Sequence, residues 1–180
     1  MNDIYLDHAA TTPVTKEVLT KMKDYITKEY GNPSSLHQAG QKAARAIKEA
    51  REKVSDLIGA EDEQEIIFCS SGTEADNLAI KGVAIAMQDK GKHIITSKIE
   101  HHAVLNSCKF LEKHFGFNVT YLDVDENGFV DVNKVEEAIK SDTILISIMM
   151  ANNEIGSIEP IKQIGEVAQK HNVYFHTDAV

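Results

Sequence analysis

The residue of this chain whose position most clearly indicates a chemical role is an aspartate that follows an apolar segment. Residues 172–177 read Asn-Val-Tyr-Phe-His-Thr, and Asp178 comes directly after them. In open α/β sheets, ligands bind beyond the carboxyl ends of the strands, so an acid in this place could face a ligand. Burying a carboxylate behind Phe175 and Val180 costs free energy unless a cation pairs with it. We therefore expect Asp178 to bind a positively charged group, although an acid at a strand end is more often a helix cap or a loop residue.

A second segment whose residues could bind a ligand is residues 70–77, which read Ser-Ser-Gly-Thr-Glu-Ala-Asp-Asn. Gly72 permits close backbone approach, Thr73 offers a hydroxyl, and a helix is expected to begin here. The free N–H groups and positive dipole end of a helix start suit a phosphate. Thr73-x-x-Asp76 also matches a capping box, which needs no ligand, so both alternatives stay open. A Walker-type nucleotide site is disfavoured because the segment contains no lysine.

Two pairs of polar residues follow other apolar segments. His101 and His102 come after one expected strand, and Asn152 and Asn153 come after another. Neighbouring histidines project differently, and no cysteine or carboxylate at metal-ligand spacing accompanies them, so we expect no metal site. One imidazole could instead present a flat surface to a ligand or carry a proton. One asparagine amide could bind a ligand oxygen. The alternative for the histidine pair is an exposed helix start, and the alternative for the asparagine pair is an ordinary turn.

The elements that must position these residues are read from the hydrophobic periodicity. Apolar residues at helical spacing predict helices, and short apolar segments between them predict strands. The expected helices are residues 14–30, 37–58, 73–89, 103–114, 131–140 and 160–171, and the expected strands are 65–69, 93–97, 118–123, 143–150 and 173–177. This alternation predicts an α/β fold with a mostly parallel sheet and helices on both faces. All four polar segments then lie at one edge of the sheet.

Composition excludes several classes of function. A net charge of −9 with scattered Lys and Arg residues disfavours nucleic-acid binding. No apolar segment of the sequence is long enough to span a bilayer, and the start of the chain lacks the features of a signal peptide. We therefore expect a cytoplasmic protein, in which Cys69 and Cys108 are buried thiols and do not form a disulfide.

Six segments together resemble the amino-terminal part of a cysteine desulfurase, a pyridoxal-phosphate enzyme that shares the class V aminotransferase fold. They are YLDHAATTP at residues 5–13, GNPSS at 31–35, SGTEADN at 71–77, EHHAV at 100–104, NNEIG at 152–156 and HTDA at 176–179. The resemblance covers the whole chain, and the NNEIG form is similar to the housekeeping and nitrogen-fixation branch. It implies PLP-dependent fold type I, with residues 1–13 in the small domain and 14–180 in a truncated, cofactor-binding large domain.

The resemblance also implies a role for each candidate residue. Gly72 and Thr73 hold the phosphate of pyridoxal 5′-phosphate, His101 stacks on the ring and shuttles protons, Asn153 binds the ring hydroxyl, and Asp178 pairs with the ring nitrogen. An ionised aspartate keeps that nitrogen protonated, so the ring can accept electrons from the substrate. The implied reaction takes sulfur from L-cysteine as an enzyme persulfide and gives L-alanine. The implied partners are a second copy, in a homodimer, and a sulfur acceptor, either an iron–sulfur scaffold or a tRNA-thiolating enzyme.

Other residues that the resemblance implies do not occur in the sequence. The lysine that binds the cofactor covalently lies in a Ser-x-His-Lys motif that is absent here, and the persulfide cysteine would come later still. We therefore expect an amino-terminal fragment that is inactive alone, and we assign no nucleophilic role to Cys69 or Cys108. A selenocysteine lyase, another class V aminotransferase-like enzyme such as an epimerase, and a non-catalytic dimerisation or scaffold module stay open as alternatives. A Rossmann-type dinucleotide binder is disfavoured because no Gly-x-Gly-x-x-Gly follows a strand.

Overall fold

The structure, a computed structural model, describes residues 4–180, which divide into two compact units. The first ends at Phe68 and the second begins at Cys69. The division expected from the resemblance, into residues 1–13 and 14–180, remains a prediction. Residues 1–3 of that first segment lie outside the described residues.

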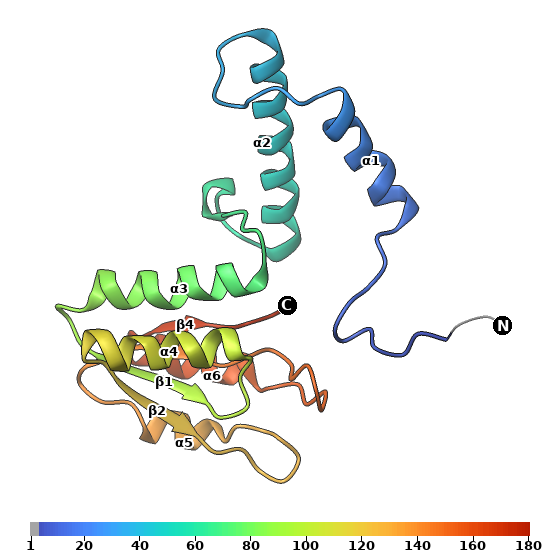
Figure 1. Ribbon diagram of the computed structural model, residues 1–180. Helices are drawn as coiled ribbons and strands as arrows, with labels where there is room; N and C mark the ends of the chain where they lie inside the picture. The colour runs from blue at the N-terminus through green and yellow to red at the C-terminus, as the bar shows by residue number, and fades with distance from the viewer. Residues whose placement is uncertain (1–3) are drawn as a thin grey trace. The chain divides into compact units, whose positions relative to one another are not determined.

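The first unit contains two long helices and a short 3-10 turn (Figure 1). Helix α1 is Lys16–Thr27 and helix α2 is Gln38–Ile58, each within a few residues of its predicted bounds. Gly59 ends α2 with a φ of 71°, the left-handed conformation that glycine adopts without strain. The turn before α2 lies so close to the helix that a Cβ at Gly40 would be 2.2 Å from the carbonyl oxygen of Ser35. A glycine at position 40 therefore allows this turn to form.

The prediction of a strand at residues 65–69 is wrong. The structure has a 3-10 turn, η1, at Glu63–Glu65, and the backbone after it is extended without belonging to a strand. A strand needs a neighbour for its backbone hydrogen bonds, and none of the strands within residues 4–180 pairs with this segment. Instead, the guanidinium of Arg51 donates to the carbonyl oxygen of Ile66 and lies 5.2 Å from the ring centre of Phe68.

The second unit alternates helices and strands, as predicted. In chain order its elements are α3 Gly72–Met87, β1 His93–Ser97, α4 His102–Phe115, β2 Asn118–Leu122, α5 Val132–Glu137, β3 Thr143–Ser147, α6 Ile161–Lys170 and β4 Tyr174–His176. The strands pair in the order β2-β1-β3-β4, and every pair is parallel. Figure 1 shows β1, β2 and β4 of this unit with helices α3 to α6 around them. Because β1 lies between β2 and β3, the order of the strands reverses between β1 and β3. Ligands of open α/β sheets bind beyond such a switch point.

Helices cover both faces of this sheet, which confirms the predicted layers. Ile94 of β1 and Leu145 of β3 pack in a cluster with α3 and α4, whereas their neighbours Ile95 and Ile146 pack in a cluster with α5 and α6. The alternation follows from the strand pleat, which directs successive side chains to opposite faces. The packed layers fix the carboxyl ends of the strands, where the candidate residues lie. Among the described residues, no helix has both the length and the apolar composition that crossing a membrane requires.

Candidate functional site

Three polar side chains from different elements meet beyond the carboxyl ends of the strands. Asp178 follows β4, His101 lies between β1 and α4, and Asp76 lies in the second turn of α3. One nitrogen or oxygen atom of each residue lies within 4.8 Å of such an atom in the other two. Asp76 is 4% exposed and Asp178 is 8% exposed, while His101 is accessible to solvent. The site therefore combines two nearly buried carboxylates with an accessible imidazole.

The start of α3 lies at the same place. A Cβ added to Gly72 would lie 2.5 Å from Cγ2 of Val180, two residues after Asp178. Thr73 is exposed and comes one helical turn before Asp76. The structure therefore brings Gly72, Thr73 and Asp178 to one place together with the His101 imidazole. The individual roles of these four residues remain predictions.

The cap of α3 begins two residues before Thr73, the residue that the sequence offered as one possible cap. The N-cap is Ser71, whose hydroxyl accepts the N–H of Glu74 at 3.2 Å, because Ser71 has the extended backbone that an N-cap requires. The carboxylate of Glu74 turns back and accepts the N–H and hydroxyl of Ser70 at 2.6 and 2.7 Å, and these bonds lower the pKa of Glu74. Ser71 and Glu74 therefore cap this helix, with Glu74 bound to Ser70 instead of to the N–H of the N-cap residue, and the alternative Thr73–Asp76 capping box does not form. The cap leaves the side chains of Thr73 and Asp76 available for other contacts.

His101 is held in one orientation by its own helix. It is the N-cap of α4, and its Nδ1 accepts the N–H of Ala103 at 3.1 Å. A neutral imidazole that accepts at Nδ1 carries its proton on Nε2. The neutral ring therefore offers an Nε2–H donor.

Glu100, which the sequence reasoning missed, fixes the loop that carries His101. Its side chain is buried, and Oε1 accepts the hydroxyl of Ser97 at 2.7 Å and the N–H of Met149 at 3.0 Å. These bonds join the end of β1 to the segment after β3. Burial raises the pKa of Glu100 to about 7 despite both hydrogen bonds, and the nearby carboxylate of Asp178 raises it as well.

The stability of the protein is expected to fall as the pH rises from about 4.5 to about 7, because the folded state holds the Glu100 proton more tightly than the unfolded state does. The expected loss is about 3 kcal/mol. The variant Glu100→Gln keeps an oxygen for Ser97 and Met149 but does not titrate, so this part of the loss should disappear. Urea unfolding of both proteins at a series of pH values measures the difference. An equal pH dependence in the two proteins would contradict the assignment.

Asn152, rather than Asn153, is the amide that organises the loop after β3. Asn152 is buried, its Nδ2 donates to the carbonyl of Ile99 at 2.9 Å, and its Oδ1 accepts the N–H groups of Glu154 and Ile155. Asn153 is exposed, and its side chain makes no hydrogen bond with the described residues. No hydrogen bond of the described residues joins the Asn153 side chain to the other candidates, and its role remains a prediction.

The two cysteines lie in different surroundings. Cys108 lies in α4 and is fully buried in the core, and burial raises its pKa to about 12. A thiol in this state supplies almost no thiolate at neutral pH. Cys69 is half-buried, and its predicted place in a core strand is wrong because that strand does not form.

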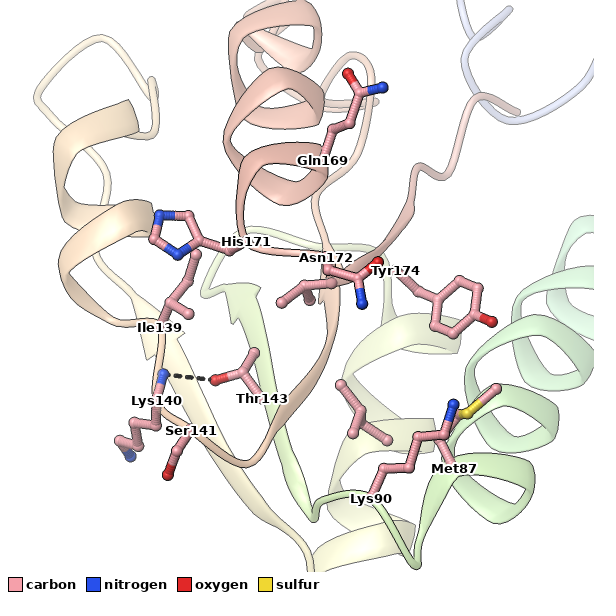
Figure 2. Close-up of a pocket in the computed structure, with 12 residues that line it drawn as sticks. Met87, Lys90, Ile139, Lys140, Ser141, Thr143, Gln169, His171, Asn172 and Tyr174 are labelled. Atoms are coloured by element: carbon pink, nitrogen blue, oxygen red, sulfur yellow. Dashed lines mark hydrogen bonds between the residues drawn. The ribbon is translucent and has the colours of Figure 1, made fainter.

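A pocket of about 830 Å³ lies at the amino-terminal ends of β3 and β4, opposite the end of the sheet that carries the candidate site (Figure 2). Thr143 and Tyr174, the first residues of β3 and β4, line it, and the hydroxyl of Thr143 accepts the N–H of Lys140 at 2.7 Å. The titratable side chains of its lining are Lys90, Lys140, His171 and Tyr174. This pocket contains none of the five residues that the sequence predicted, so it is not the candidate site.

Two carboxylates and an imidazole could bind either a metal ion or a protonated nitrogen base. Similarity to known proteins bears on this choice. The family described as aminotransferase class-V matches residues 4–180. The chain belongs to the class V aminotransferase family.

Members of the class V family that act as cysteine desulfurases are similar to this chain over almost all of its length. The cysteine desulfurase IscS of Dictyoglomus turgidum is 58% identical over 178 residues, which cover 99% of this chain and 45% of that protein. The IscS of Methanosarcina thermophila is 59% identical, covering 98% of this chain and 43% of that protein. A solved structure described as SspA in complex with cysteine has a TM-score of 0.91 and 47% identity, covering 96% of this chain and 49% of that chain.

These similarities confirm the resemblance to cysteine desulfurases and, with it, PLP-dependent fold type I. The chain spans less than half the length of the class V relatives that it matches.

Proposed function

We propose that this chain is part of a pyridoxal 5′-phosphate-dependent cysteine desulfurase. The observation that carries the proposal is the buried carboxylate of Asp178, which lies beside His101 and the start of α3. The chain that contains this arrangement is 58% identical to a cysteine desulfurase. One relative of known structure is described as a complex with cysteine, which supports L-cysteine as the substrate here.

The side chains present fit both charged ends of the cofactor. The start of α3 offers free N–H groups, a glycine and the hydroxyl of Thr73 to a phosphate, and the carboxylate of Glu74 is turned away towards Ser70. Asp178 and its neighbour Asp76 suit a protonated nitrogen. A metal ion would use the carboxylates but leave the helix start without an anion. The combination therefore favours pyridoxal phosphate over a metal.

Each residue has a distinct task in this proposal. The cofactor supplies a ring that accepts electrons when its nitrogen is protonated. Asp178 would keep the proton on that nitrogen, His101 would present its imidazole to the ring with a proton at Nε2, and Asn153 would donate to the ring hydroxyl. Gly72 and Thr73 hold the phosphate and so fix the position of the ring.

The proposed reaction breaks the bond between Cβ and sulfur in L-cysteine. The sulfur joins a cysteine thiolate of the enzyme as a persulfide, and the carbon skeleton leaves as L-alanine. Cys108 does not supply this thiolate because it is fully buried. We further propose a cytoplasmic homodimer that passes the sulfur to an iron–sulfur scaffold or a tRNA-thiolating enzyme.

Thr73→Val is expected to weaken the binding of pyridoxine 5′-phosphate about tenfold, because a charge-assisted hydrogen bond to the phosphate is lost. This probe has an alcohol where the cofactor has an aldehyde, so its binding needs no lysine. Isothermal titration calorimetry of the 180-residue chain measures the affinity.

Thr20→Val is the matched control, since the Thr20 hydroxyl donates only within α1, to the carbonyl of Lys16 at 2.7 Å. It should bind the probe as the wild type does. Pyridoxine, which lacks the phosphate, should bind the wild type and Thr73→Val equally weakly. The proposal fails if the wild type prefers neither molecule, or if Thr73→Val binds the phosphate ester as tightly as the wild type.

A further inference from the structure

The function proposed above names the second carboxylate of the site, Asp76, only as a neighbour of Asp178 and gives it no role of its own. Its Oδ1 lies 3.5 Å from Nε2 of His176, and Nδ1 of the same imidazole lies 2.9 Å from the hydroxyl of Ser147. Ser147 is fully buried, so this row of serine, histidine and aspartate cannot present a nucleophile to a substrate.

The charge of Asp76 favours one tautomer of His176. Oδ1 of an ionised Asp76, 3.5 Å away, favours a proton on Nε2, and Nδ1 is then the acceptor of the Ser147 hydroxyl. Burial lowers the pKa of His176, although the charge of Asp178 acts in the opposite direction. The lowered pKa of His176 favours the neutral imidazole, which lies beside Asp76 and leaves the negative charge of that carboxylate in place.

The titratable groups that face Asp76 come from two packed elements. Asp178 and His176 approach from β4 and the segment after it, and His101 approaches from the start of α4. Two carboxylates that are close together and nearly buried oppose each other's ionisation. Burial first and Asp178 second raise the pKa of Asp76 to about 6, while His101 lowers it. Glu100 also faces Asp178, from the loop before α4.

We propose that Asp76 is a positioning residue for the cofactor: when it is ionised and bound to His176, it adds a second negative charge that strengthens the hold of Asp178 on a protonated ring nitrogen. The inference rests on the proposed function, because the ring nitrogen belongs to pyridoxal phosphate. Asp76 acts through the charge of the site and does not touch the reacting atoms. The advantage that it confers appears as the pH rises through about 6.

The test compares the affinity of the wild-type chain and of Asp76→Asn for pyridoxine 5′-phosphate at two pH values. Asparagine mimics the protonated acid at every pH, so the two proteins should bind equally near pH 5. Near pH 8 the variant should bind about tenfold more weakly, and the pKa of the bound ring nitrogen, read from its absorbance, should be about one unit lower. The phosphate of the probe itself titrates near pH 6, so the ratio of the two affinities is the quantity to use.

Asp123→Asn removes the same charge from an exposed residue after β2 that pairs with Lys98, and it should follow the wild type at both pH values. A loss in Asp76→Asn that is equal at both pH values means a structural role and overturns the inference. If Asp178→Asn weakens binding while Asp76→Asn does not, the inference falls and the proposed function stands.

A second measurement needs no ligand. The ring nitrogens of His176, followed by NMR across the pH range, should show a step near pH 6 as Asp76 loses its proton, and this step should be missing in Asp76→Asn, in which only His176 itself titrates. If that step is absent, the inference is wrong, whether or not the chain binds the probe. If the chain does not bind the probe, the proposed function is wrong.

Discussion

Replacement of Asp178 by asparagine is expected to weaken the binding of pyridoxine 5′-phosphate about 100-fold near pH 8, because truncation of one partner in a buried charge pair costs several kcal/mol. The carboxylate of Asp178 is only 8% exposed, so little solvent screens its attraction for a cation. An amide in its place cannot hold the proton on the ring nitrogen. The bound ring should therefore lose that proton, which changes its absorbance.

The size of this effect separates Asp178 from other acids at the same edge of the sheet. Asp123→Asn, which alters an exposed acid, should change the affinity by less than about twofold, because exposed ion pairs contribute little. Binding of inorganic phosphate should not differ between the wild type and Asp178→Asn. If Asp178→Asn binds the probe as tightly as Asp123→Asn does, Asp178 does not face the ring nitrogen.

Ile146→Ala is expected to lower the free energy of unfolding by about 3 kcal/mol, the usual cost of removing a large side chain from a packed core. Ile146 lies in the middle of β3 with no exposed surface, and it packs in the cluster with α5 and α6. Urea unfolding followed by circular dichroism measures the change.

Leu145→Ala tests the other face of the same strand. Leu145 is 1% exposed and packs with α3 and α4, so its loss should cost a similar amount. Ile158→Ala is the control, because Ile158 is 68% exposed and its truncation should cost less than about 0.5 kcal/mol. A small effect at only one of the two buried positions would show that one helical layer is not packed as described.

The elements that the sequence predicted correctly are those whose own pattern decides their structure. Ile94-Ile95 in β1 and Leu145-Ile146 in β3 are apolar at consecutive positions, as strands covered on both faces must be, and both strands form. Residues 65–69 have a similar apolar pattern but form no strand. Their structure depends on a neighbouring strand, which local pattern does not reveal.

The candidate site was predictable only in part. Asp178 and His101 could be found because each follows a predicted strand, which places them at the ligand-binding edge. Asp76 and Glu100 could not, because burial gives them their chemical character and burial depends on elements far away in the sequence. His176 carried a usable signal, since residues two apart on a strand point to the same side, which places it beside Asp178.

The contact between Gly72 and the segment after Asp178 joins the beginning of the second unit to its end. During synthesis the helix start emerges from the ribosome long before the aspartate does. A nascent chain can therefore offer one half of the site early, but the second half arrives only when β4 takes its place. In the proposed function, a ligand that binds both halves then selects those molecules in which β2, β1, β3 and β4 are already aligned.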